Sequence, residues 1–228
     1  MIERLIEHLR SHANPANVAG MARYGISSVG TLGVPVYILR RVARSTVKET
    51  GRNHAMAQAL WNSGIHEARI LATLIDDPAL VTARQMDLWA RDIDSWDVCD
   101  HACHNLFRYT PRAFAKAAQW ARAKREFVRR AGFSLMAGLA VKAKDATDEQ
   151  FEAFLPLIAE AASDDRNMVK KSVNWALRQI GKRNRRLHKL AIAAAEEIRR
   201  QDSRSARWIA ADASRELRNP ATVARIKR

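Results

Sequence analysis

A tryptophan and a carboxylate lie one helical turn apart in the segment 95–108. The apolar residues there recur at helical spacing and predict a core stripe of Val98, Cys99, Ala102, Cys103, Leu106 and Phe107. Trp96 and Asp100 are four residues apart and share a helix face, with Trp96 at the edge of that stripe and Asp100 off it. An indole face and a carboxylate both attract positive charge, and such a pair can cradle a cationic group. The alternative role for Asp100, favouring the helix dipole, suits Asp97 better.

A second tryptophan stands among cations in the segment 168–182. Its apolar residues define one side of a helix, and the opposite side holds Lys171, Trp175, Arg178 and Lys182. An indole directed away from the core loses hydrophobic free energy, on the order of a few kcal/mol, unless a partner covers it. The partner is either a bound ligand or a neighbouring Lys or Arg in cation–π contact. The cations of this face are candidate contacts to phosphates.

An arginine with small neighbours characterises the segment 126–142. The helical wheel places Arg130 opposite the core side, next to Ser134 and Ala137, and places Arg129 nearer the core. A guanidinium with free space around it suits bidentate contact to a phosphate, although a solvated surface arginine is the ordinary alternative.

Other reactive groups predict little chemistry. The two cysteines, Cys99 and Cys103, fall on the core stripe, while His101 points elsewhere, so we expect no metal and no cofactor. Two cysteines also exclude a disulfide scaffold and suit a reducing compartment. The glycines at 30 and 33 match no phosphate-binding loop, and no nucleophile motif is present.

The charge is strongly lopsided. The chain has 39 Lys and Arg against 24 Asp and Glu, a formal net charge of +15. Residues 1–110 account for +1 of it and residues 111–228 for +14. This asymmetry indicates a polyanionic partner, most simply nucleic acid, with an anionic membrane surface as the rival. The uncharged run 26–39 is too short to span a bilayer, and charges near the N-terminus argue against a secretory signal.

The elements that carry these residues are predicted to be helices. Glycine and proline are scarce, which disfavours a β-rich fold. Helices are expected over 2–12 and 17–23, followed by a loop at 25–35 with three of the nine glycines, and helical patterning resumes at Tyr37. Helix pairs with short polar breaks follow.

These pairs repeat. A basic residue recurs in similar contexts at gaps of 61, 41 and 36 residues, and the first gap has room for an extra repeat around 96–107; the recurring residues are Arg69, Arg130, Lys171 and Arg207. Such periods predict an all-α, HEAT-like solenoid, an α-α superhelix with a concave basic face and a single domain over 1–228. An irregular helical bundle is the alternative.

The chain resembles the AlkD-type DNA alkylation repair glycosylases over most of its length. The resemblance lies in the tryptophan-aspartate block 95–100, the arginine helix 127–131, the second tryptophan helix 173–178, and 21–24 followed by 31–34. Phe127 stands where the family pattern has a bulkier aromatic residue.

The resemblance implies a base-excision enzyme that hydrolyses the N-glycosidic bond of N3- or N7-alkylated purines in duplex DNA without flipping the base into a pocket. It implies that Asp100 is the catalytic carboxylate, that Trp96 and Trp175 flank the lesion deoxyribose, and that Arg130 and Tyr24 contact DNA. A cytoplasmic, nucleoid-associated monomer with no membrane partner is expected.

Two other functions remain open: a non-catalytic DNA-binding HEAT module and a protein scaffold. Asp100 distinguishes the glycosylase from a pure DNA binder, since on the DNA-binding face of a pure binder a carboxylate would only repel phosphates.

Overall fold

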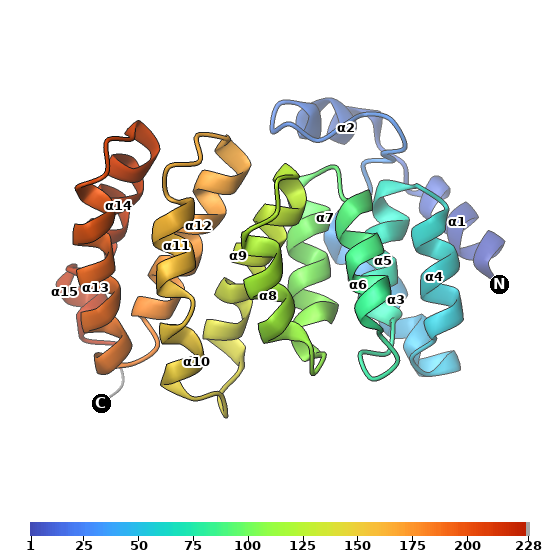
Figure 1. The fold of residues 1–228 in the computed structure, drawn as a ribbon. Coiled ribbons are helices and arrows are strands. Elements are labelled where there is room, and N and C mark those ends of the chain that lie inside the picture. The colour runs from blue at the N-terminus through green and yellow to red at the C-terminus, as the bar shows by residue number, and fades with distance from the viewer. Residues whose placement is uncertain (227–228) are drawn as a thin grey trace. The chain divides into compact units, whose positions relative to one another are not determined.

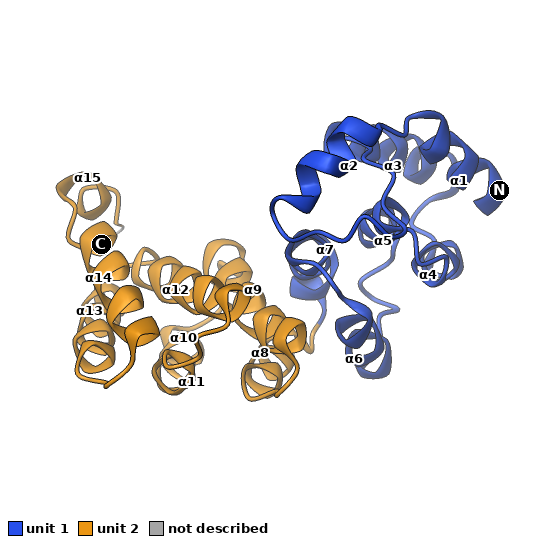
Figure 2. Ribbon diagram, turned by 90° about the horizontal axis from the view of Figure 1, so that it is seen from above, with its two compact units in different colours: residues 1–110 blue, residues 111–228 orange. Residues whose placement is uncertain are grey.

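The described residues form two compact helical units. The computed structural model describes residues 1–226; Lys227 and Arg228, at the end of the basic C-terminal segment, lie outside them. Unit 1 spans Met1–Thr110, and unit 2 begins at Pro111 (Figure 2). The boundary coincides with the point where the charge of the sequence changes. No strand occurs in the described part of the chain, so the all-helical prediction is confirmed.

Unit 1 begins with α1 and continues with α2 and the loop after it, residues 15–34, which we call the N-terminal arm. Its elements are α1 (Ile2–Ser11), α2 (Pro15–Ala22), α3 (Val36–Thr50), α4 (His54–Asn62), α5 (His66–Ile75), α6 (Ala83–Asp92), α7 (Trp96–His101), a π-helical turn (Ala102–Leu106) and a 3₁₀ turn (Phe107–Tyr109). Within the unit, α2 lies outside the helix pairs (Figure 1). Two buried indoles stack in the core of the unit: the rings of Trp61 and Trp89 are parallel within 3° at a centroid distance of 4.0 Å.

Unit 2 stacks helix pairs. Its elements are α8 (Ala113–Ala121), α9 (Glu126–Lys142), α10 (Asp148–Glu152), α11 (Leu155–Ala161), α12 (Asn167–Gly181), α13 (Arg185–Arg199), α14 (Arg204–Leu217) and α15 (Pro220–Val223). Helix α9 packs between α8 and α12 (Figure 1) and is buried on nearly all sides. Gly132 makes this possible, because a Cβ there would lie 2.5 Å from the backbone nitrogen of Ala121.

The predicted repeat corresponds to helix pairs. Arg69, Arg130, Lys171 and Arg207 lie on α5, α9, α12 and α14, and each of these is the second helix of a packed pair. The first gap is longer because α6 and α7 occupy it, where the sequence left room for an extra repeat.

Polar residues start many of these helices at the positions where local chemistry requires them. The side chains of Asn53, Thr82, Asn184 and Ser203 each accept a hydrogen bond from a backbone N–H of the first turn. Such caps satisfy amide donors that lack a partner within the helix. Among residues 1–226, no helix is both long and apolar enough to cross a membrane.

Candidate functional site

The tryptophan-aspartate segment begins as an α-helix and ends as a wider turn. Helix α7 carries Trp96 and Asp100, and the π-helical turn Ala102–Leu106 follows directly. The predicted core stripe is confirmed, because its members, which include both cysteines, are fully buried. The opposite side of the segment, with Trp96, Asp97, Asp100, His101, His104 and Asn105, lines a pocket. π-Helical turns of this kind often mark functional sites.

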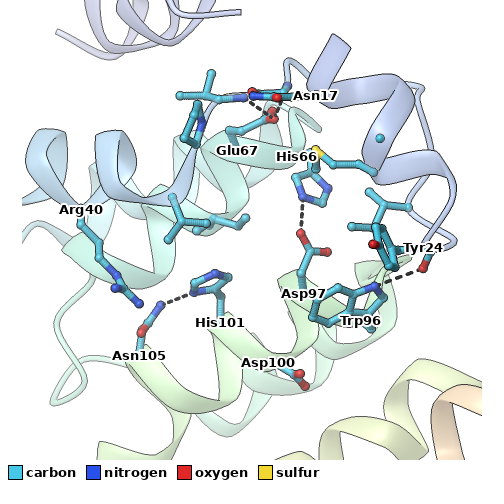
Figure 3. A pocket seen from close by; sticks show the side chains of 18 of the residues that line it. Asn17, Tyr24, Arg40, His66, Glu67, Trp96, Asp97, Asp100, His101 and Asn105 are labelled. Atoms are coloured by element: carbon cyan, nitrogen blue, oxygen red, sulfur yellow. Dashed lines mark hydrogen bonds and ion pairs between the residues drawn. The ribbon is translucent and has the colours of Figure 1, made fainter. Parts of the chain in front are cut away.

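The pocket has a volume of about 640 Å³ and is formed by unit 1 alone (Figure 3). We call it the α2 pocket, because residues of α2 and the loop after it form one wall, facing α5 and α7; its lining residues include Gly20, Met21, Tyr24, Ile26, Val34, Arg40, His66, Glu67, Ile70, Trp96, Asp97, Asp100, His101 and Asn105. Asp100 and Trp96 are both partly exposed on this lining. The motifs gave no sign of such a cavity.

Tyr24 and Trp96, which are far apart in the sequence, meet at the pocket. The indole Nε1 of Trp96 donates a hydrogen bond to the backbone oxygen of Tyr24 at 3.2 Å (Figure 3). The Tyr24 residue is 71% exposed. The hydrogen bond fixes the indole against the end of the N-terminal arm and leaves the phenol accessible. Three predicted site residues, Tyr24, Trp96 and Asp100, are therefore gathered within one unit.

An ion pair that the sequence did not suggest lies in the pocket. His66 Nε2 and Asp97 Oδ2 are 2.8 Å apart, and both side chains are largely buried. Burial acts to lower the pKa of His66, but the hydrogen bond and the charge of Asp97 outweigh it, and the pKa is raised. Burial acts to raise the pKa of Asp97, yet the bond to His66 leaves it lowered. No local pattern reveals the pair, since its members are 31 residues apart.

Further along the pocket, His101 is held by a neighbouring amide. Asn105 Nδ2 lies 3.0 Å from Nδ1 of His101 and 3.1 Å from the hydroxyl of Thr73. Burial lowers the pKa of His101 and favours the neutral imidazole. The amide is the donor in this contact, so Nδ1 accepts and the proton of the neutral ring is on Nε2. The exposed side chain of Arg40 extends toward these two residues (Figure 3).

A buried carboxylate holds the N-terminal arm in place. Glu67, 1% exposed at the start of α5, accepts backbone hydrogen bonds from Leu32, Gly33 and Val34 at 2.9, 2.6 and 3.2 Å. Gly33 has a φ of +76°, and a Cβ there would lie 2.3 Å from the oxygen of Asn14. The glycine-containing loop thus turns tightly around Glu67 and sets the position of α2.

Four predicted residues lie on α12 of unit 2. Trp175 is partly exposed and Lys171 is exposed, as the helical wheel predicts. Arg178 and Lys182 instead pair with Glu216 of α14, Lys182 at 2.5 Å. Lys171 is therefore better placed than these two cations to meet a phosphate.

The helical wheel is wrong about the placement of Arg130. The residue is 6% exposed, and its Nη1 donates to the backbone oxygen of Met168 at 2.9 Å. The neighbours Ser134 and Ala137 are fully buried as well. The cause is that α9 packs against α8 on one side and α12 on the other, so it has no solvent face at this level. Arg129 is the more exposed of the two arginines and pairs with Asp164 at 3.0 Å.

Comparison with known proteins identifies the family. A family model described as "DNA alkylation repair enzyme" matches residues 5–217. The chain belongs to this family. Membership confirms the resemblance found in the motifs. It supports DNA as the partner of this protein and DNA repair as its role. No curated protein matches the chain.

A solved structure shares the fold of this DNA alkylation repair family member. It is described as "A new family of proteins related to the HEAT-like repeat DNA glycosylases with affinity for branched DNA structures". The TM-score is 0.75 at 16% sequence identity, covering 100% of this chain and 97% of the other. The HEAT-like repeat fold predicted from the spacing is thereby confirmed.

Proposed function

We propose that this protein is a DNA glycosylase that hydrolyses the N-glycosidic bond of N3- or N7-alkylated purines in duplex DNA. The main support is the pairing of Trp96 with Asp100 on one turn of α7, partly exposed beside Tyr24, in a member of the DNA alkylation repair family. A protein that only bound phosphates would gain nothing from an accessible carboxylate at this position.

The chemistry follows from the charge of the substrate. An N3- or N7-alkylated purine is already cationic, so it leaves as a neutral base and needs no general acid. Bond breaking transfers positive charge to the deoxyribose, as in glycoside hydrolysis. Asp100 stabilises this oxocarbenium ion and orients the attacking water, and the indole of Trp96 adds cation–π attraction.

Residues of unit 2 complete the proposal. The family resemblance assigns Trp175 to the lesion deoxyribose, and its partly exposed position on α12 is compatible with that role. Lys171 is the strongest candidate for phosphate contact on the same helix, because it is exposed and pairs with no acid in the described chain. The side chain of Arg130 is buried and bonded to the backbone oxygen of Met168. It therefore contacts the DNA backbone only if the protein rearranges around Met168.

The decisive experiment measures base release from duplex DNA that contains 7-methylguanine. We expect Asp100→Asn to lose excision by a factor of about 100 or more while it still binds DNA, because only the electrostatic stabilisation is removed. Asp145→Asn is the matched control: it makes the same charge change at an exposed position of unit 2 and should excise normally. Excision by Asp100→Asn at the wild-type rate would contradict the proposed mechanism, and no release of any alkylpurine by the wild type would contradict the enzymatic function.

A second variant pair tests the DNA contact. Lys171→Ala should weaken binding to all duplexes alike and reduce the salt dependence by about one counterion. Lys142→Ala, an exposed lysine at the end of α9, is the control for a general loss of charge. Equal effects of both substitutions would remove the specific role of Lys171.

Binding to branched DNA without catalysis is the second candidate function. It is favoured by the fold shared with a protein related to glycosylases that has affinity for branched DNA, and by the +14 charge of residues 111–228. A four-way junction bound much more tightly than a linear duplex at the same salt concentration, together with no base release, would favour it.

A further inference from the structure

Helices α12 and α14 of unit 2 pack against each other through a regular row of side-chain contacts (Figure 1). Asn174 of α12 donates to Asp212 of α14 at 2.7 Å, and one turn further along both helices Arg178 pairs with Glu216. The members of each pair are 38 positions apart, so the two contacts are equivalent steps of one row. At both steps a carboxylate of α14 meets a donor of α12.

An indole replaces the carboxylate at the next step of this row. One turn before Asn174, the ammonium of Lys170 lies 5.1 Å from the ring centroid of Trp208, again 38 positions away. An aspartate or glutamate at position 208 would continue the row with an ion pair. The indole leaves Lys170 without an acid within residues 1–226, and it is itself 41% exposed, more than any other tryptophan of the chain. A cation–π contact at an exposed site contributes much less than burial of the indole would, so packing within unit 2 does not explain this residue.

The surroundings of Trp208 are basic. Arg204, one turn earlier on the same face of α14, and Lys171 of α12 are both exposed and form no ion pair within residues 1–226. Arg207 pairs at 3.2 Å with Asp202, but this pair lies in solvent and competes weakly with another anion. We define the Trp208 platform as Lys170, Lys171, Arg204 and Trp208.

The acid that follows Trp208 on the same face of α14 is already compensated. Asp212 lies one turn after the indole, accepts from Asn174 and pairs with Arg215. The Trp208 platform therefore presents a flat aromatic surface in a positively charged setting.

This combination matches a nucleotide whose base is already unpaired. Within a duplex the faces of each base are covered by the neighbouring pairs, so a base is free to stack on an indole only at a strand end, a gap or a branch point. Stacking on aromatic side chains together with contacts from Lys and Arg to phosphates is the usual way in which proteins bind single strands. A continuous duplex can use only the cations.

We propose that the Trp208 platform binds unpaired bases of DNA where a single strand leaves the duplex. The base stacks on Trp208, and the three cations contact the adjoining phosphates. The proposal rests on the DNA binding that both candidate functions share, and it requires neither a pocket nor a base turned out of its pair. It assigns to unit 2 the feature by which branched DNA would be preferred over linear duplex.

The first test compares two ligands that differ in stacking alone. One is a duplex with a short single-stranded extension, and the other is the same duplex with an abasic extension, which keeps the phosphates. We expect the wild type to bind the extension with bases about tenfold more tightly, because stacking of one base changes affinity by roughly 5- to 150-fold. Trp208→Leu should bind both ligands equally, and Trp208→Phe, which keeps an aromatic face, should retain the preference.

Both variants should fold. The replaced side chain is exposed, and leucine is a better helix former than tryptophan. Circular dichroism and urea unfolding check this expectation.

Two results would overturn the proposal. One is equal binding of the two extensions by the wild type, and the other is an unchanged preference in Trp208→Leu. Failure of the platform is distinguished from failure of the proposed catalysis by a linear duplex that contains 7-methylguanine. Trp208→Leu should bind and excise it like the wild type, whereas Asp100→Asn should lose excision and keep the preference for the extension with bases.

Fluorescence of 2-aminopurine reports the stacking directly. Placed in the extension, this base should lose fluorescence when the wild type or Trp208→Phe binds, and should change little with Trp208→Leu, because stacking on an aromatic ring quenches it. Placed within the duplex, it should not respond to binding. A rise there would mean that a paired base is turned out, which contradicts the proposal.

Discussion

Removing the Glu67 carboxylate should release the N-terminal arm while the rest of the protein stays folded. Oε1 accepts from Gly33 and Val34, and Oε2 accepts from Leu32. Helix α2 buries no residue of its own, so the arm is held by these three bonds together with the buried side chains of Ile26 and Val34 and the bond from Trp96 to the backbone of Tyr24. Hydrogen bonds to a charged group contribute about 1.5–3 kcal/mol each, against about 1 kcal/mol for neutral ones.

The magnitude depends on what replaces the carboxylate. Glu67→Gln keeps one oxygen for Gly33 and Val34 but sets an NH₂ group against the N–H of Leu32, so we expect the arm to lose about 2–4 kcal/mol. Glu67→Ala leaves all three donors without their acceptor, and we expect about 4–5 kcal/mol. Because 1.4 kcal/mol corresponds to a factor of ten in an equilibrium constant, a loss of about 3 kcal/mol means that the open state of the arm is populated roughly 100-fold more.

Amide hydrogen exchange measures this opening directly. The amides of Leu32, Gly33 and Val34 should exchange roughly 100-fold faster in Glu67→Gln, and those of α9, which belongs to unit 2, should not change. The order of the variants is part of the prediction, with alanine more severe than glutamine. Wild-type exchange rates at the three amides in Glu67→Gln would refute the reasoning, because they would mean that packing alone holds the arm.

Three further predictions concern packing, capping and pH. Gly132→Ala should destabilise the protein by about 1–3 kcal/mol or more in urea unfolding, since its Cβ meets backbone atoms of α8, whereas Gly20→Ala should be neutral or stabilising. Arg183 donates to the backbone oxygens of Ala140, Ala143, Lys144 and Ala146 and stacks on Phe151, so Arg183→Lys should cost about 2–4 kcal/mol, while Arg185→Lys at an exposed site should not. The pKa of His66 is raised, so its contribution to stability is complete below about pH 6.5 and is lost as the pH rises through the folded-state pKa. The pKa of Asp97 is lowered, so its contribution is present above about pH 3.8 and is lost as the pH falls through the folded-state pKa. The stability difference between wild type and His66→Asn should therefore be larger at pH 5.5 than at pH 8.5, and an equal difference at both values would show that the charge of the pair contributes nothing.

The charge of unit 2 shows how far composition leads. The excess of 27 basic over 13 acidic residues after position 110 indicates a polyanionic partner. Many of these cations have structural roles that the count does not reveal. Arg166 and Arg129 share Asp164, Arg186 pairs with Glu149 and Glu152, and Arg183 caps the end of α9. The number of cations predicts that the partner is negatively charged. Only the folded structure shows which cations are engaged in ion pairs or caps and which remain available to bind that partner.

The α7 segment and α9 illustrate the difference between one-sided and two-sided helices. On the α7 segment one face is core and the other lines a pocket, so helical spacing alone predicted which residues are buried and left Trp96 and Asp100 accessible. On α9 the same reasoning failed for Arg130, because a neighbouring helix covers the face that the wheel assigned to solvent. Periodicity reports how a helix divides into faces, and it does not report how many neighbours that helix has.

The sequence by itself determined the helical class, the repeat, the family and the one turn that joins an indole to a carboxylate, because each is written in local spacing and composition. The tertiary structure alone decided the His66–Asp97 pair, the clasp of Glu67 on the loop before α3, and the open space next to Gly20. These depend on contacts between residues 31 to 35 positions apart, or on the absence of a side chain where several elements meet. Contacts of that kind arise only when the chain is folded, since no local preference specifies which distant residue will arrive.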